Sequence, residues 1–310
     1  MAVRCGALSL GAQGNSYLEK GEWQASLAYR WLHSDRHFIG DREQPRRQEL
    51  GTEVINDIHT FDLSLARGLT SRFSLALTLP FAQADRSSLY EHDRTNRHGM
   101  QAGGLGDVRL VGTVWVFDPP GHTNGNLAFG AGIKAPTGDY EATDYKFKPA
   151  GPVLSYVDSS IQPGDGGWGI LLEAQGFQKV VDRLFAYASA SYLINPREKI
   201  PSTGYSVWDS YLFRVGASYA IWPSQGLSLS LGGRMEGVPS TDLFGGSSGF
   251  RRPGYAISIE PGIAWTHQKW TLSVTAPVAL ERNRERNFAR VPGDAAFADY
   301  LITSAISYRF

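Results

Sequence analysis

The sequence predicts an all-β fold, namely a transmembrane, antiparallel, up-and-down β-barrel of twelve strands with short periplasmic turns and long extracellular loops. Three observations predict it. Apolar and small or polar residues alternate in twelve segments, tight and long connections follow one another in turn, and the chain ends in an aromatic residue after an alternating strand.

The alternation has a period of two, which puts successive side chains on opposite faces of a strand. Every second residue is large and mostly apolar from Phe73 to Phe81, from Tyr211 to Ile221 and from Trp270 to Leu280, whereas the residues between them are mostly small or polar. One face of each strand is therefore suited to lipid.

Twelve segments carry this pattern, each near the roughly 9 to 11 residues that a tilted strand needs to cross a bilayer. They are Glu22 to Ser34, Glu53 to Arg67, Arg72 to Ala84, Gly106 to Phe117, Asn126 to Ala135, Gly167 to Lys179, Leu184 to Ile194, Trp208 to Ile221, Leu227 to Gly237, Gly254 to Thr266, Trp270 to Glu281 and Ala298 to Phe310. We expect residues 1–21 to form an N-terminal periplasmic segment and residues 22–310 to form the barrel.

The connections alternate strictly in length. Tight links lie at 68–71, 118–125, 180–183, 223–226 and 267–269, and long polar segments lie at 35–52, 85–105, 136–166, 195–207, 238–253 and 282–297. In outer-membrane barrels the short turns face the periplasm and the long loops face outward. An even strand number then places both chain termini on the periplasmic side.

A soluble β-sandwich is the main alternative fold, because its strands alternate as well. A sandwich gives no reason for connections to alternate in length. Tryptophans also gather near the predicted strand ends, as expected for rings at the two lipid interfaces: Trp23, Trp31, Trp168, Trp222, Trp265 and Trp270. The last strand ends at Phe310, which is typical of the signal read by the barrel-assembly machinery.

Composition excludes several other classes. The 310 residues hold 30 Lys+Arg and 30 Asp+Glu, so no net charge favours nucleic acid. No apolar run approaches the roughly 20 residues of a spanning helix. Cys5 is the only cysteine, which excludes an intrachain disulfide, and we interpret it as a buried or free thiol rather than a lipid anchor. Residues 1–4 are too short for a signal peptide, so an exported protein would be represented here by its processed chain.

Charged residues recur on the face opposite the lipid-facing set. They are Arg30, Asp62, Arg109, Lys134, Glu173, Arg214, Arg234, Glu236, Glu260, Glu281 and Arg309. An Arg or Lys at the bilayer midplane costs about 2–4 kcal/mol, so we expect these side chains to line a polar lumen. They either pair across strands or form rings that select what passes. Many inward residues, such as Ser26, Gly130 and Gly232, are small and leave room for a passage.

No catalytic or metal motif stands out. An outer-membrane phospholipase needs Ser, His and an orienting group together, but the seven histidines are scattered and His59 is the one on a strand worth examining. His92, Asp93 and His98 lie in one loop without a closing set of metal ligands. We expect no enzyme activity, no metal and no cofactor.

Three glycine-rich motifs resemble a known family. Gly104-Leu105-Gly106-Asp107 opens a strand, Lys134-Ala135-Pro136-Thr137-Gly138-Asp139 closes the next, and Gln162-Pro163-Gly164-Asp165-Gly166-Gly167-Trp168 follows. Over residues 103–172 the chain resembles the outer-membrane β-barrel family assigned to the meta-cleavage pathway of phenol degradation, whose members are also described as transporters. Ala135 departs from the larger apolar residue expected before the proline. The resemblance implies an outer-membrane barrel, with a channel for aromatic or other small compounds.

The sequence therefore predicts a porin-like channel in the outer membrane of a Gram-negative bacterium that passes small, aromatic or hydrophobic molecules passively. Its expected partners are outer-membrane lipid and lipopolysaccharide, the barrel-assembly machinery and a small-molecule solute. The alternative is a non-transporting barrel whose long loops, above all 136–166 and the basic tip 282–286, bind a surface protein.

Overall fold

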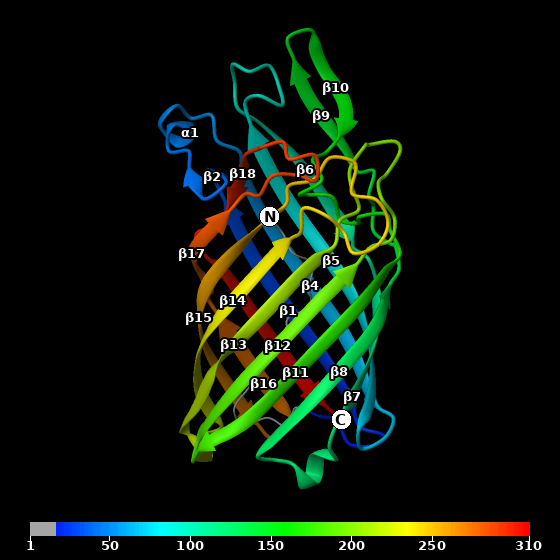
Figure 1. The fold of residues 1–310 in the computed structure, drawn as a ribbon, viewed down its shortest axis with the longest axis vertical. Coiled ribbons are helices and arrows are strands. Elements are labelled where there is room, and N and C mark those ends of the chain that lie inside the picture. Colours follow the sequence, from blue (N-terminus) through cyan, green and yellow to red (C-terminus); the bar gives the residue numbers. More distant parts are fainter. Residues whose placement is uncertain (1–16) are drawn as a thin grey trace.

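The computed structural model describes residues 17–310, which form a closed antiparallel barrel (Figure 1). In order around the wall its strands are β1 (Trp23–Ser34), β4 (Ile55–Gly68), β5 (Phe73–Ser88), β7 (Arg109–Trp115), β8 (Gly125–Lys134), β11 (Gly169–Val181), β12 (Leu184–Ile194), β13 (Ser210–Trp222), β14 (Leu227–Val238), β15 (Gly254–His267), β16 (Trp270–Thr275) and β19 (Leu301–Arg309). β1 pairs with β19 and closes the ring, so the predicted twelve-stranded barrel is confirmed.

Two of the twelve strands are interrupted. β6 (His98–Leu105) continues the line of β7 along β5, and β17 (Val278–Asn283) continues the line of β16 along β15. Pro277 lies in the second gap, where it has no N–H to donate to the sheet. The sequence predicted continuous strands at 106–117 and 270–281; the first begins three residues later, at Arg109, and the second is divided.

The outer wall is apolar because the alternating large residues face away from the lumen. Phe61, Leu77, Phe129, Val215 and Leu231 are each 39–64% exposed, although they lie within strands. Such a belt is stable only against hydrocarbon, since an apolar surface of this extent is rare on soluble monomers. Among residues 17–310, no helix is long and apolar enough to cross a membrane.

Aromatic residues mark both ends of the wall. Trp23, Trp222, Trp265 and Trp270 lie at strand ends beside the short turns, and Trp270 packs on Tyr308 at 4.6 Å between ring centroids. At the opposite end, Trp168 directly precedes β11, Trp31 lies near the end of β1, and Trp31 packs against Tyr300. The predicted grouping of tryptophans near strand ends is confirmed.

The long connections contain more structure than the sequence suggested. β5 and β6 extend as a hairpin into the expected loop 85–105, and the loop 35–52 folds into β2 (Arg36–Ile39), β3 (Arg42–Glu43) and α1 (Arg46–Glu49). β2 also pairs with β18 (Ala295–Phe297). β9 (Thr143–Lys148) and β10 (Gly151–Tyr156) form a hairpin that projects beyond the barrel (Figure 1). Two short 3-10 turns, η1 (Pro119–Gly121) and η2 (Pro223–Gln225), lie at the other end.

The expected periplasmic segment 1–21 lies almost entirely outside the described residues, as does Cys5. Its described part, Tyr17–Gly21, leads into β1, and the N–H of Gly21 donates to the carbonyl of Gly68 at 2.7 Å. The first and last strands end side by side, since Trp23 and Phe310 exchange two backbone hydrogen bonds of 2.9 Å. The start of β1 and the end of β19 therefore both lie at the end of the barrel that has the short turns.

Candidate functional site in the barrel lumen

A segment of the connection between β8 and β11 folds into the barrel. This segment, Val157–Gly167, is named the inward loop here. Val157 and Ile161 are almost fully buried and pack in one cluster with Leu32, Ile58, Ala84, Met100, Ala102 and Leu301. Leu32, Ile58 and Ala84 lie on the face opposite the exposed wall residues of their strands, so the cluster lies inside the barrel. The inward loop therefore narrows the extracellular half of the lumen.

Asp158 holds the outer end of the inward loop. Its carboxylate accepts two hydrogen bonds from Arg252 at 2.7 and 2.8 Å and lies 3.6 Å from Arg86. Arg86 also binds Glu91, and Asp158 and Arg86 are both buried. Burial alone would raise the pKa of Asp158, but the charges of Arg252 and Arg86 outweigh burial and lower the pKa. The carboxylate is therefore charged at neutral pH and clamps the loop.

The three glycine-rich motifs meet at the inner end of the inward loop. A side chain at Gly138 would lie 2.7 Å from the Cα of Gly164 and 2.9 Å from the backbone of Gly106, so the three backbones touch. Only glycine allows such an approach. Asp107 accepts hydrogen bonds from the N–H of Gly138 at 3.0 Å and of Asp165 at 3.1 Å. The motifs thus form one anchor for the loop.

Lys134 completes this anchor. Its Nζ pairs with the carboxylates of Asp165 and Asp107, the latter at 3.4 Å, and all three side chains are largely buried. The sequence singled out Lys134 but neither aspartate as a lumen charge. The motifs that contain Asp107 and Asp165 were the available signal, although sequence spacing alone does not show that they meet.

Below the inward loop, ion pairs cross the lumen. Glu236 on β14 binds Arg30 of β1 at 3.1 Å, although three other strands, β15, β16 and β19, lie between these two around the wall. Glu236 also binds Arg234 at 2.7 Å, and Arg234 lies 3.6 Å from Glu260, which pairs with Arg214. The result is an alternating chain of five charges. Each charged group in this chain lies next to a group of opposite charge, and their attraction offsets the free-energy cost of removing them from water.

A second pair, Arg109 on β7 and Asp62 on β4, spans the intervening strand β5 at 2.6 Å. The structure thus brings together eight of the eleven charges selected from the sequence: Arg30, Asp62, Arg109, Lys134, Arg214, Arg234, Glu236 and Glu260. The alternation in the sequence could not show that these charges pair across the lumen as well as between neighbouring strands.

The other three selected charges lie apart. Glu173 faces the lumen without an ion pair within residues 17–310, and Arg309 lies at the end of the last strand, where its Nε donates to Gln24 at 3.1 Å. Glu281 does not face the lumen: it accepts a hydrogen bond from Tyr255, whose side chain lies on the outer face with Ile257 and Ile259. A register shift between Ile257 and Ser258 turns Glu281 outward, so the prediction for this residue is wrong.

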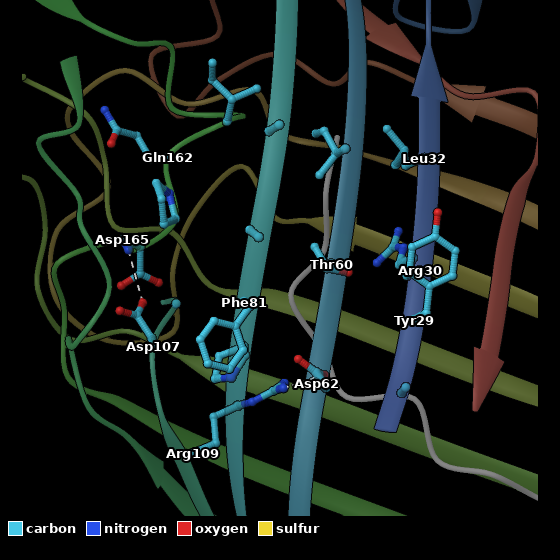
Figure 2. A pocket seen from close by; sticks show the side chains of 18 of the residues that line it. Tyr29, Arg30, Leu32, Thr60, Asp62, Phe81, Asp107, Arg109, Gln162 and Asp165 are labelled. Atoms are coloured by element: carbon cyan, nitrogen blue, oxygen red, sulfur yellow. Dashed lines mark hydrogen bonds and ion pairs between the residues drawn. The ribbon is translucent and has the colours of Figure 1, made fainter. Parts of the chain in front are cut away.

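A cavity of about 100 Å³ lies between the inward loop and the charges (Figure 2). Its apolar wall includes Leu32, Ile58 and Ile161, and its polar wall includes Arg30, Asp62, Arg109 and Asp165. Figure 2 shows Gln162 and Asp165 of the inward loop on the other side of this space from the strands that carry Leu32, Thr60 and Asp62. Such a site suits a small molecule with an apolar body and a polar end.

An aromatic group lies at the opposite end of the lumen. Trp115 is almost fully buried and packs edge-on against Phe177 at 6.1 Å, and Phe177 lies 6.4 Å from Phe185. These residues come from β7, β11 and β12, which are close in the wall. The lumen therefore runs from an apolar level through a charged level to an aromatic one.

The histidines lie away from this lumen site. His59 shares a 2.8 Å hydrogen bond with the hydroxyl of Tyr29, and its register partners on the two neighbouring strands are Trp31 and Gln83. His92 and His98 pack against Phe147 of the projecting hairpin. Within residues 17–310, no group of three His, Cys, Asp or Glu side chains is arranged to hold a metal ion.

Comparison with known proteins supports the fold. An outer membrane channel from Pseudomonas putida F1 is similar over 100% of both chains, with a TM-score of 0.60 and 14% identity. The β domain of the Bordetella autotransporter BrkA matches over 94% of this chain and 100% of its own, with a TM-score of 0.50 and 12% identity. No protein-family model and no curated protein sequence matches the chain. The fold is therefore that of outer-membrane barrels.

Proposed function

We propose that this protein is a channel in the outer membrane of a Gram-negative bacterium that lets small molecules pass through its lumen. The observation that carries the proposal is the inward loop, which narrows a lumen otherwise lined by paired charges and small residues. A loop that is held by ion pairs at one end and by glycine contacts at the other can restrict a passage without filling it. The structural similarity to an outer membrane channel supports this proposal.

The cavity suggests the kind of solute. Its volume of about 100 Å³ is of the same order as the ~150 Å³ apolar cavity that holds benzene in an engineered protein. An apolar wall opposite charged groups favours a small aromatic or similarly compact apolar compound that carries a polar substituent. The resemblance of the glycine-rich motifs to a family assigned to phenol degradation supports the same class.

The test is conduction by the purified barrel. Single-channel recording in planar bilayers should give small, discrete currents, and proteoliposomes should swell faster in small phenolic solutes than in a disaccharide. Empty liposomes and liposomes with an unrelated closed barrel serve as controls. Absence of both current and solute flux, with a barrel shown to be folded, would contradict the proposal.

The partners expected from the sequence belong to this proposal. The apolar wall would contact lipid and lipopolysaccharide. The last strand would be read by the barrel-assembly machinery, and Phe310 at its end is 53% exposed and stacks at 6.0 Å on Tyr308. Truncation of Phe310 should lower the amount of assembled barrel in the outer membrane.

A second function is favoured by the projecting hairpin. Tyr145, Phe147, Leu154 and Tyr156 alternate on one of its faces, and each is at least 36% exposed. Such a surface could bind a protein outside the cell. The basic tip 282–286 gives less support, because Arg282 and Arg284 are buried and bind Asp299 and the carbonyl of Pro253. Deletion of residues 143–156 should abolish partner capture and leave conduction intact.

A further inference from the structure

Glu173 is the selected lumen carboxylate that has no ion pair among the residues that the structure describes. The paired set holds five cations and five carboxylates: Arg30, Arg109, Lys134, Arg214 and Arg234 with Asp62, Asp107, Asp165, Glu236 and Glu260. Glu173 on β11 faces the same lumen, and within residues 17–310 it makes no hydrogen bond or ion pair. Each of these five cations binds a carboxylate of the paired set, and none of them forms an ion pair with Glu173.

Glu173 lies in a row of small and polar residues on the inner face. Thr113 of β7 pairs in register with Gly130 of β8, Gly130 pairs with Glu173, and Glu173 pairs with Ser191 of β12. Residues directly opposite one another on a sheet have Cβ atoms about 4.5–5.5 Å apart, so these side chains are neighbours. The row crosses four adjacent strands.

Gly130 leaves a space beside the carboxylate. A Cβ atom at Gly130 would lie 3.2 Å from Glu173 Oε2 and 3.5 Å from Thr113 Oγ1. The two oxygens therefore face one small space from opposite sides, and any side chain larger than that of glycine would begin to fill it. The glycine keeps this space open.

Ser191 closes the row on the other side. It is 8% exposed, and its Oγ has no hydrogen-bond partner among the described residues. A buried hydroxyl without a partner costs about 1–3 kcal/mol, which a bound ligand or water would recover. Since Ser191 is the register partner of Glu173, this hydroxyl adjoins the Glu173 carboxylate.

We infer that Glu173, Thr113 and Ser191 form a binding site for a small monovalent cation in the lumen and make passage selective for cations. Carboxylate and hydroxyl oxygens are the ligands that hard cations prefer. One carboxylate matches one positive charge, whereas divalent sites usually recruit more carboxylates. Arg109, whose charge acts on Glu173, forms its ion pair with Asp62. This inference rests on the proposed channel function. It adds that the channel passes small monovalent cations in preference to anions.

Reversal potentials in a potassium chloride gradient test the selectivity. The wild-type barrel should pass K⁺ in preference to Cl⁻, Glu173→Gln should abolish the preference, and Ser191→Ala should reduce it. Glu281→Gln is the matched control, because it removes a glutamate from the outer face of the same barrel and should leave the ratio unchanged. Equal permeability ratios in the wild type and Glu173→Gln would overturn the inference.

A second measurement separates this inference from the channel proposal. The Tm of the full-length protein in detergent is compared in potassium chloride and in N-methyl-D-glucamine chloride at equal ionic strength. K⁺ should raise the Tm of the wild type and of Glu281→Gln but not that of Glu173→Gln. If the wild type carries no current, the channel proposal fails and the Tm comparison alone decides on the cation site. A Tm that does not depend on K⁺ would then overturn the site.

Discussion

Asp158 controls the position of the inward loop through two guanidinium groups. Removal of one partner of a buried ion pair costs about 3–5 kcal/mol, because the remaining charge stays buried without compensation. Here two arginines, Arg252 and Arg86, would lose the same carboxylate, although Arg86 would keep Glu91. A single carboxylate therefore decides whether the outer end of the loop stays docked.

We predict that Asp158→Asn releases the outer end of the inward loop. Single-channel recording should show a larger mean conductance or a longer open time, and the Tm should fall. Asp182→Asn is the control, since Asp182 lies in a short turn and is 82% exposed. If Asp158→Asn conducts like the wild type, the loop is held by its other contacts and Asp158 is not the clamp.

The same ion pairs predict a response to acid. The pKa of Asp158 is lowered because the charges of Arg252 and Arg86 outweigh burial, and the pKa of Glu91 is lowered because its hydrogen bond and charge interaction with Arg86 outweigh burial. A carboxyl group with a lowered pKa stabilises the docked loop above its ordinary pKa, near 3.8 for Asp158, and this stabilisation is lost as the pH falls through the folded-state value. Conductance should therefore stay constant from about pH 7 to pH 5 and rise below about pH 4. A rise already between pH 7 and pH 5 would point to a different group.

At the scale of the element, the inward loop depends on three glycines from three separate segments. Gly106, Gly138 and Gly164 let the backbones meet, and Asp107 accepts hydrogen bonds from two of these segments. The strand gap after Leu105 belongs to the same arrangement, because Gly106 and Asp107 lie in this gap between β6 and β7. The anchor therefore links the barrel wall to the loop inside it.

We predict that Gly138→Ala displaces the inner end of the inward loop. Its Cβ would lie 2.7 Å from a backbone atom of Gly164, which cannot rotate away as a side chain could. The expected result is a Tm lower than that of the wild type and a raised conductance. Gly121→Ala is the control, because a Cβ there meets nothing within 4 Å. An unchanged Tm and conductance in Gly138→Ala would contradict the proposed anchor.

The molecule as a whole depends on a wall that faces hydrocarbon on one side and a charged lumen on the other. Val215 lies within β13 and is 64% exposed on the outer face. We predict that Val215→Arg lowers the free energy of unfolding from lipid bilayers by about 2–4 kcal/mol, as expected for a cation near the midplane. Urea titration of the barrel in liposomes measures this value.

Leu243→Arg is the control for the whole-molecule prediction. Leu243 is equally exposed, at 60%, but it lies in the long connection between β14 and β15, outside the wall. Its substitution should change the free energy of unfolding little. Equal losses for the two variants would mean that Val215 does not face lipid.

Much of the barrel could be predicted from the sequence because the period-two pattern is local. The residues that alternate along a strand, as from Phe73 to Phe81, also determine which face meets lipid, and no distant contact is needed to see this. The same reasoning placed Arg30, Asp62 and Glu236 inside. It was wrong for Glu281, since a bulge shifts the register by one residue and nothing in the local pattern announces it.

The sequence by itself determined the strand number, the direction of the apolar wall and the set of charges that cannot face lipid. Only the tertiary structure decided which charges meet, because Arg30 and Glu236 are 206 residues apart and lie on strands that are not neighbours. It also decided that the connection after β8 turns into the lumen and that Glu173 has no ion-pair partner within residues 17–310. Alternation constrains each strand separately, whereas pairing across a lumen depends on closure of the whole ring.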